Sequence, residues 1–421
     1  MIQLQVQPSR SQLIDSLSVK AEGSGWLWIA IFSIVYFPLT ILRAAARPMW
    51  FDELFTFYIS RLDLAKIWAI LSSGSEPNPP LCYVLTHASM RLFGENEIAV
   101  RLPEIIGYWL MSICIFFFVR RRCSALPAAA AMLFPLSTKA YLQYSVEARP
   151  YGMVLGFCAL AAFCWQCASD SASARTRAIA TAGFSLALMA ALCSHYYSVL
   201  LLIPFGVGEL VRWWKTGWLN KSLSAALVLS LLPLIPLSSA LKRGSGFITH
   251  FVKASPVFWA KPTPTAIPLF YIESLAGTLA PLLLTAIVVV MFEVFWRRDK
   301  TASQDSLRQP PLHEIAMIVA LTAIPVFATV IGVLATGSFI ARYALSALVG
   351  CSMLFGFLVY RGSKGRFSIA AASVLVFFGW FFVNSQTTCA GPEQGGSQLA
   401  RGCLQPTGFP KAVALRLTRF G

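Results

Sequence analysis

Long apolar segments recur along almost the whole chain, and they constrain its fold more than any other feature. Each is about 17–25 residues long, which is enough for an α-helix to cross the hydrocarbon core of a bilayer. Backbone polar groups inside a bilayer must bond to one another, so such segments are expected as helices. The sequence therefore predicts an all-α polytopic membrane protein. We expect eleven transmembrane helices, at residues 26–42, 99–119, 124–140, 150–168, 177–194, 196–211, 222–241, 266–296, 313–335, 339–360 and 366–384.

Composition agrees with a membrane protein. Of the 421 residues, 57% are hydrophobic and only 12% are charged, whereas soluble domains are about half apolar and a quarter charged. The net charge of +16 is high enough to attract nucleic acid. However, the basic residues stand in short clusters between apolar segments, as in the cytoplasmic loops of membrane proteins. We therefore expect membrane lipids around the chain and no nucleic-acid partner.

The basic clusters also orient the chain. Segment 79–93 is short and contains His87 and Arg91. If it does not cross the membrane, five basic clusters share one side, which the positive-inside rule assigns to the cytoplasm. If segment 79–93 crosses, all five basic clusters lie outside, against the positive-inside rule. We therefore predict that 79–93 is a juxtamembrane helix on the outer surface. The clusters are 120–122, 175–177, 212–215, 296–300 and 361–366.

This orientation gives one transmembrane domain with two long outer loops. Ala44-x-Ala46, after the first apolar segment, looks like a signal-peptidase site, but that segment is longer than a typical signal sequence and we expect it to remain as a helix. Cys389 and Cys403 share the polar tail, where a disulfide remains an open alternative if the compartment is oxidising. The predicted parts are a cytoplasmic segment 1–25, a transmembrane domain 26–384 with outer loops 43–98 and 242–265, and an outer tail 385–421.

Two adjacent carboxylates, Asp52 and Glu53, follow the first apolar segment among aromatic residues. They are either a solvated interfacial pair or part of a site. Adjacent side chains diverge on a helix or a strand, so we expect one to face a cavity and the other to be structural or a secondary ligand. A carboxyl group in an apolar, aromatic environment has a raised pKa, which suits a general base.

Cationic residues stand at other outer helix ends. Arg149 follows Glu147 and precedes Pro150, so it either pairs internally or presents its planar guanidinium to a phosphate. Arg342, followed by Tyr343, lies at another outer end. Two outward arginines favour an anionic ligand at the membrane surface.

Two weaker signals lie on the same side. His195, followed by two tyrosines, is either an ordinary interfacial residue or a contact to a phosphate or sugar hydroxyl. Loop 242–265 is basic, which reflects either a weak charge bias or a flexible lid in which Lys253 and Lys261 contact phosphate. The sequence has no P-loop, zinc-protease or dinucleotide motif. Few ionisable residues lie at mid-bilayer, which disfavours an ion-coupled transporter.

Five segments then occur in a recognisable order: "FDE", "EPNPPLCYVLTHASMRLFGENEIAVRLPEIIG", "YSVEARPYGMVL", "SHYYSVLLLIPF" and "ARYALSALVG". Together they resemble bacterial GT-C glycosyltransferases of the protein O-mannosyltransferase and aminoarabinose-transferase type, over residues 26–360. This resemblance implies a GT-C fold in the bacterial inner membrane. It also implies an enzyme that transfers sugar from a polyprenyl-phosphate-linked donor to a lipid, glycan or protein acceptor at the periplasmic face.

The resemblance also implies roles for residues. Asp52 matches the catalytic base, with Glu53 and Glu147 as further carboxylates, while Arg149, Arg342, His195 and Tyr343 lie where the donor phosphate binds. Attack opposite the phosphate would invert the sugar's anomeric centre. No cofactor is required, although a divalent metal bridging Asp52, Glu53 and Glu147 stays open. The alternative function is a lipid-linked-sugar transporter or flippase without catalysis.

Overall fold

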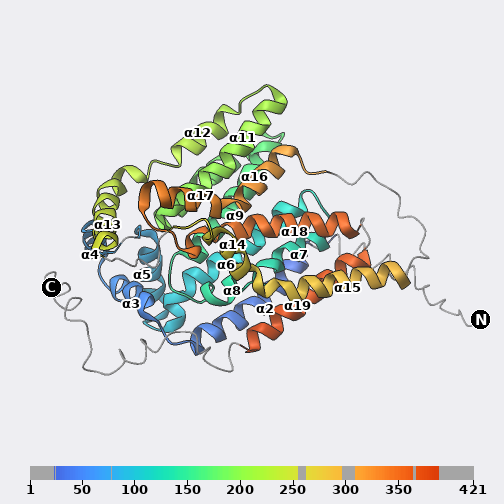
Figure 1. The fold of residues 1–421 in the computed structure, drawn as a ribbon, viewed down its shortest axis with the longest axis horizontal. Coiled ribbons are helices and arrows are strands. Elements are labelled where there is room, and N and C mark those ends of the chain that lie inside the picture. Colours follow the sequence, from blue (N-terminus) through green and yellow to red (C-terminus); the bar gives the residue numbers. More distant parts are fainter. Residues whose placement is uncertain are drawn as a thin grey trace, which may run out of the picture.

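The computed structural model describes Gly23 and residues 25–76, 78–254, 262–295, 309–363 and 367–387, and every regular element within them is a helix (Figure 1). The α-helices are α2 (Gly25–Ala46), α3 (Phe51–Ser60), α4 (Leu64–Ser72), α5 (Leu81–Phe93), α6 (Glu97–Arg120), α7 (Ala125–Leu133), α8 (Lys139–Tyr144), α9 (Tyr151–Asp170), α10 (Ala174–Ser194), α11 (Leu202–Thr216), α12 (Lys221–Leu229), α13 (Leu234–Ala254), α14 (Ala266–Leu275), α15 (Leu279–Phe295), α16 (Leu312–Thr322), α17 (Ile324–Ile331), α18 (Ala347–Ser363) and α19 (Phe367–Thr387). Short 3₁₀ or π turns join several of them.

The apolar segments are helical, as predicted, and the protein is a multi-pass membrane protein. Among the described residues, α2, α6, α9, α10 and the stretch Ala266–Met291 are each long and apolar enough to span a bilayer. Two further segments are bent, by 42° between α12 and α13 and by 50° between α16 and α17, which gives up to seven spans. Three shorter apolar helices accompany them. The number of eleven crossings stays a prediction.

The outer loops contain more helix than their polar composition suggests. Segment 79–93 contains α5, which has 13 residues, fewer than a crossing needs. α13 continues to Ala254, so the first half of the predicted loop 242–265 is helical. Cys389 and Cys403 lie outside the described residues, so their pairing stays a prediction.

Close packing of α6 against α9 fixes the centre of the bundle. Gly107 and Gly152 bring the two backbones together: a Cβ on Gly107 would lie 2.4 Å from the backbone of Gly152. Small residues allow such contacts between membrane helices. Because α9 begins at Tyr151, this contact also holds the start of α9 in place.

Helices α3, α4 and α5 form a cap at one end of the bundle, where α13 contacts α4 (Figure 1). Buried Ile59, Ile67, Ile70, Leu71 and Tyr83 form a separate small core within this cap. The cap therefore covers the end of the bundle at which α2 finishes and α9 begins.

Replacing Gly152 with alanine should destabilise the protein, because the added Cβ would lie 2.5 Å from the carbonyl oxygen of Glu104. Overpacking of this kind costs about 1–3 kcal/mol. Thermal unfolding in detergent measures the loss. The matched control is Gly206→Ala in α11, where nothing lies within 4 Å of the added Cβ. Equal melting temperatures for the two variants would contradict the α6–α9 contact.

Candidate active site

A buried ion pair between Glu53 and Arg101 organises the candidate site. Both side chains are 0% exposed, and Arg101 donates from Nε and Nη2 to the two carboxylate oxygens of Glu53, each at 2.7 Å. The same carboxylate accepts the backbone N–H of Ala148 at 2.8 Å and that of Trp50 at 3.2 Å. Glu53 therefore links the start of α3, the beginning of α6 and the loop before α9.

Arg101 also joins the end of α2 to this pair. Its remaining donors bond to backbone carbonyl oxygens of Ala44 at 2.6 Å, Arg47 at 2.6 Å and Pro48 at 3.2 Å. An arginine has five N–H donors, and this set of bonds uses all of them. The segment that carries Asp52 is thus held from both sides.

Asp52 lies in the first turn of α3, immediately beside this fixed point. Its Oδ2 accepts a hydrogen bond from Nη1 of Arg342 at 3.2 Å. The Asp52 side chain is 23% exposed, so it can meet a ligand, in contrast to Glu53. The two adjacent carboxylates thus have different environments.

Arg149 lies nearby and is buried. Its Nη2 donates to Oε1 of Glu76 at 3.2 Å, and its Nε has no hydrogen-bond partner. Burial alone would lower the pKa of Arg149, but the charge of Glu76 and the groups around it raise that pKa above its ordinary value. Arg149 is therefore a permanent cation with an unused donor.

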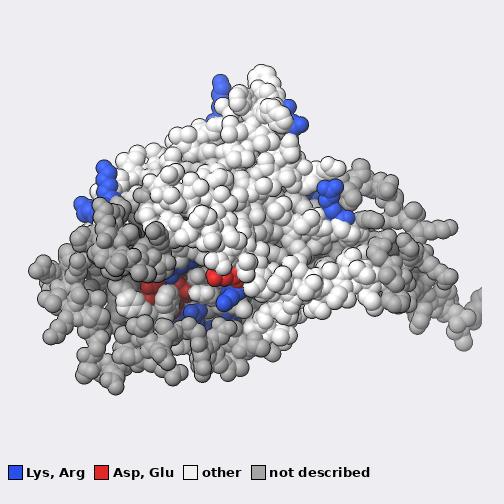
Figure 2. All heavy atoms as spheres, viewed as in Figure 1, with Lys and Arg blue, Asp and Glu red and all other residues white. Residues whose placement is uncertain are grey.

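Aromatic rings pack around Arg342 and His195. The ring of Tyr343 stacks on that of Tyr197 at 4.6 Å and lies 5.0 Å from the His195 ring, while the guanidinium of Arg342 lies 5.7 Å from the centre of the Tyr151 ring. These residues line a hollow with about 320 Å³ of empty space, its open mouth included. On the molecular surface, acidic and basic side chains lie close together in one area, while most of the remaining described surface is neither (Figure 2).

His195 is neutral and can donate one hydrogen bond. Its Nδ1 accepts the backbone N–H of Tyr197 at 3.2 Å, so the neutral ring carries its proton on Nε2. Burial, with the charges of Arg149 and Arg342, lowers the pKa of His195 to about 3. A neutral Nε2–H donor suits a phosphate or hydroxyl oxygen.

Glu147 is buried and forms no ion pair with another described residue. Both carboxylate oxygens are buried, and neither has a hydrogen-bond partner. Burial raises the pKa of Glu147 to about 7, although the charge of Arg342 acts in the opposite direction. Buried carboxylates without partners are costly, and groups with perturbed pKa values concentrate at functional sites.

The structure brings together most of the predicted site residues. Asp52, Glu147, Arg149, Arg342, His195 and Tyr343 lie in one electrostatically coupled cluster. Glu53 is adjacent but fully bonded. The side chain of Lys253 and the whole of Lys261 lie outside the described residues. Within the described chain, no group of three or more His, Cys, Asp or Glu side chains is arranged to hold a metal ion.

Sequence reasoning assigned no role to four residues of this region: Arg101, Glu76, Tyr151 and Tyr197. Arg101 and Glu76 belong to the motif segment "EPNPPL…AVRLPE", and an arginine amid apolar residues is itself a signal, because a charge buried in a membrane helix needs a partner. That partner, Glu53, is 48 positions earlier, which local patterns do not reveal.

Comparisons with known proteins agree with this architecture. Residues 77–239 match the family model described as dolichyl-phosphate-mannose-protein mannosyltransferase. Two crystal structures of ArnT from Cupriavidus metallidurans are similar, one in the apo state and one bound to undecaprenyl phosphate. They align at TM-scores of 0.61 and 0.58 with 15% and 14% identity, and each alignment covers 87% of this chain and 77% of ArnT. The chain has a GT-C glycosyltransferase fold.

The resemblance to GT-C enzymes of the ArnT and protein O-mannosyltransferase type is thereby confirmed. No curated protein matches the sequence. At 15% identity, the ArnT alignment shows the shared fold and leaves individual residue roles to be argued from this site.

Replacing Glu53 with glutamine should destabilise the protein strongly, because Arg101 would stay buried without its anion. Breaking a buried pair by removing one partner costs about 3–5 kcal/mol. Asp52→Asn, at the next position, is the matched control, because partly exposed pairs contribute about 0–1 kcal/mol. Thermal unfolding of both variants tests this difference, and similar melting temperatures would refute the structural role of Glu53.

The raised pKa of Glu147 should make stability depend on pH. The folded state binds this proton more tightly than the unfolded state, whose pKa is about 4.5, so stability falls as pH rises from about 4.5 to about 7. The loss is up to about 3 kcal/mol. Glu147→Gln should abolish it and should be the more stable protein at pH 8.

Chemical denaturation at pH 5 and pH 8 measures the difference between wild type and Glu147→Gln at each pH. This comparison isolates Glu147 from His195, whose lowered pKa makes stability rise with pH between about 3 and 6.5. A difference that does not change with pH would show that Glu147 titrates normally.

Proposed function

We propose that this protein is a membrane glycosyltransferase that moves a sugar from a polyprenyl-phosphate-linked donor to an acceptor hydroxyl. The observation that carries the proposal is the Asp52–Arg342 contact at one end of an apolar bundle, beside Arg149, His195 and the unpartnered Glu147. The fold shared with ArnT, one of whose structures holds undecaprenyl phosphate, supports a lipid-linked donor.

The physical requirements of such a donor fit this end of the bundle. A polyprenyl tail stays in lipid, so its phosphate must lie at the interface, where cations and hydrogen-bond donors can reach it. Nε of Arg342 and Nε of Arg149 are buried without partners, and His195 offers Nε2–H. Charge-assisted bonds from arginine to phosphate are among the strong hydrogen bonds of proteins. These three residues form the proposed phosphate site, with Tyr343 packed against His195.

The proposed reaction is a single displacement at the anomeric carbon. The acceptor oxygen attacks this carbon, its proton passes to the carboxylate of Asp52, and the bond to the donor phosphate oxygen breaks with its electron pair on the phosphate. Arg342 and Arg149 stabilise the charge on the departing phosphate. Attack opposite the phosphate inverts the anomeric centre.

Arg342 links base and phosphate in this scheme. Its Nη1 bonds to Asp52, and a bound phosphate would compete for the same guanidinium. Donor binding would then release Asp52 to accept a proton. Glu147 is the second candidate base, because its carboxyl group is buried and its pKa lies near neutrality.

The reaction needs no cofactor, since phosphate is a good leaving group. Both oxygens of Glu53 already accept hydrogen bonds, so Asp52, Glu53 and Glu147 do not form a free set of metal ligands. We further propose that the protein lies in the bacterial inner membrane with the site facing the periplasm, because the basic clusters at the opposite end fit the cytoplasmic side. The acceptor can be a lipid, a glycan or a protein.

Replacing Asp52 with asparagine should reduce sugar transfer by roughly 100- to 10,000-fold, the usual contribution of a general base. Asparagine keeps the size and polarity of the side chain but cannot accept the proton. Transfer from labelled polyprenyl-phosphate sugars in membrane vesicles measures this effect. Asp63→Asn, an exposed acidic residue before α4, is the matched control and should keep full activity.

This experiment tests two claims separately: that the protein is a glycosyltransferase, and that Asp52 is its general base. Full transfer by Asp52→Asn would support the enzymatic function but would show that Asp52 is not the base, which would then be assigned to Glu147. Flipping of labelled lipid-linked sugars by wild-type protein, without any transfer to an acceptor, would instead favour the transporter alternative.

A further inference from the structure

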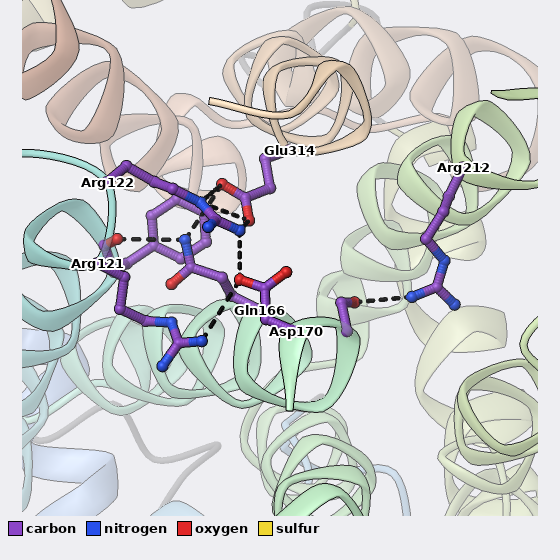
Figure 3. Close-up of polar contacts among 8 residues, drawn as sticks. Arg121, Arg122, Gln166, Asp170, Arg212 and Glu314 are labelled. Atoms are coloured by element: carbon purple, nitrogen blue, oxygen red, sulfur yellow. Dashed lines mark hydrogen bonds and ion pairs between the residues drawn. The ribbon is translucent and has the colours of Figure 1, made fainter. Parts of the chain in front are cut away.

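At the end of the bundle opposite the candidate active site, one group of charged residues is fully paired (Figure 3). Arg122 bonds to both Glu314 and Asp170, and Asp170 also pairs with Arg121 at 3.4 Å. Gln166 donates to Glu314 at 3.2 Å. These contacts tie α6, α9 and α16 together and use the charges of both acidic residues.

The neighbouring acid on α11 is used in the same way. Glu209 accepts from Arg212 at 2.6 Å and from Nε1 of Trp165 at 2.7 Å, and Arg212 also donates to Ser169 at 3.0 Å. Asp170, Glu209 and Glu314 thus each have a cationic partner. The charges of these three acids on α9, α11 and α16 are therefore already balanced by internal partners.

On α10, α11 and α12, four exposed cations have no such partner among the described residues. We call them the basic ledge: Arg175 and Arg177 at the start of α10, Lys215 at the end of α11 and Lys221 at the start of α12. All four are exposed, and none forms an ion pair with a carboxylate in the described part of the chain. Their charges are therefore available to an external partner.

Helix packing brings the ledge together. Ser185 on α10 donates to the carbonyl oxygen of Ala226 on α12 at 3.0 Å, and the two helices pack against each other. At 1.5 Å of rise per residue, Arg177 then lies one turn beyond the level of Lys221. Lys215 is six residues before Lys221, across a tight turn at Gly217, whose φ is +71°. The four cations therefore all lie at helix ends on this side of the bundle.

Three exposed tryptophans stand among these cations. Trp213, Trp214 and Trp218 are 50%, 74% and 82% exposed, and Nζ of Lys215 lies 5.0 Å from the centre of the Trp214 ring. Tryptophan is enriched at the level of lipid headgroups, where its ring is apolar and its N–H is polar. Lys and Arg side chains project from the top of the molecule, where α11 and α12 meet, and no acidic side chain is visible there (Figures 1 and 2).

The surface immediately below the ledge is apolar. Exposed side chains on the same three helices include Ile179 and Leu186 on α10, Leu210 on α11, and Val228 and Leu229 on α12. An acyl chain can lie along such a surface, while its headgroup remains at the level of the tryptophans and the cations. A nucleic-acid partner would have no use for this apolar surface.

We propose that the basic ledge binds the headgroups of anionic phospholipids, with the tryptophans marking the interface and the acyl chains along α10, α11 and α12. Because these four cations have no carboxylate partner within the described chain, they attract negatively charged headgroups more strongly than zwitterionic ones. Basic sites between transmembrane helices bind anionic headgroups in this way. Because the ledge lies at the end opposite Asp52, this lipid site is separate from the proposed donor site.

The test is binding of phosphatidylglycerol and phosphatidylcholine to the purified full chain in detergent, measured by native mass spectrometry at increasing lipid concentration. Wild type should prefer phosphatidylglycerol, and this preference should weaken with salt. Each cation near a membrane surface contributes roughly fivefold. The variant Lys215→Gln with Lys221→Gln should therefore lower the preference by about 10- to 30-fold.

The matched control removes the same charge elsewhere. Lys66→Gln with Arg91→Gln changes exposed cations on α4 and at the end of α5, in the cap at the other end of the bundle and away from the three tryptophans. This control should keep the preference of wild type. An equal loss in both double variants would show that only total charge matters and would overturn the proposed site. So would equal binding of the two lipids by wild type.

Thermal unfolding without added lipid checks that the variants are folded. All changed residues are exposed, so their melting temperatures should match that of wild type. A further pair, Trp214→Phe and Trp218→Phe, should weaken binding of both lipids to a similar degree, because the tryptophans do not recognise headgroup charge. Loss of the phosphatidylglycerol preference alone in this pair would contradict the proposed division of roles.

Discussion

The buried pair of Glu53 and Arg101 is the interaction on which the candidate active site depends. It connects the end of α2, the start of α3, the beginning of α6 and the loop before α9. Neither side chain is accessible, and water cannot compensate either charge, so the two must stay together. Asp52, the next residue along α3, is then placed by an anchor that takes no part in ligand binding. Glu53 thus holds the start of α3 rigidly in place, while the neighbouring Asp52 keeps an accessible carboxylate oxygen.

Several charged groups of the candidate site are only partly paired. Arg149 and Arg342 each have one carboxylate partner yet keep a buried Nε without an acceptor, and Glu147 has no partner at all. Buried polar groups without partners lower the stability of the fold. An anionic ligand with several oxygen atoms would satisfy the two arginines at once, and an acceptor hydroxyl could bond to Glu147. The stability cost of these unpartnered groups and the proposed affinity for a phosphate-linked substrate thus have the same physical origin.

The sequence predicted the helices well because length and hydropathy are local properties. It placed the site residues on one side of the membrane, but it could not show that Arg342 contacts Asp52 across 290 positions. Adjacent side chains diverge, so different roles for Asp52 and Glu53 were expected, yet which was structural depended on Arg101. The extension of α13 to Ala254 was missed because polar, basic segments read as loops. The bends near Pro233 and Pro325 carry a clearer local signal, since proline begins helices more readily than it continues them.

Acidic and basic side chains are arranged differently at the two ends of the bundle. We relate this difference to the ligand proposed for each end. At the site end, acids and bases occur together, so a ligand must compete with internal pairs such as Asp52–Arg342. At the opposite end, Asp170, Glu209 and Glu314 pair with Arg122 and Arg212. The cations of the basic ledge are exposed beside the tryptophans. Competition at the first end favours ligands that offer several bonds in a fixed geometry. The unpaired cations of α10, α11 and α12 at the second end impose no such fixed geometry, which suits the headgroups of anionic lipids in the plane of the membrane.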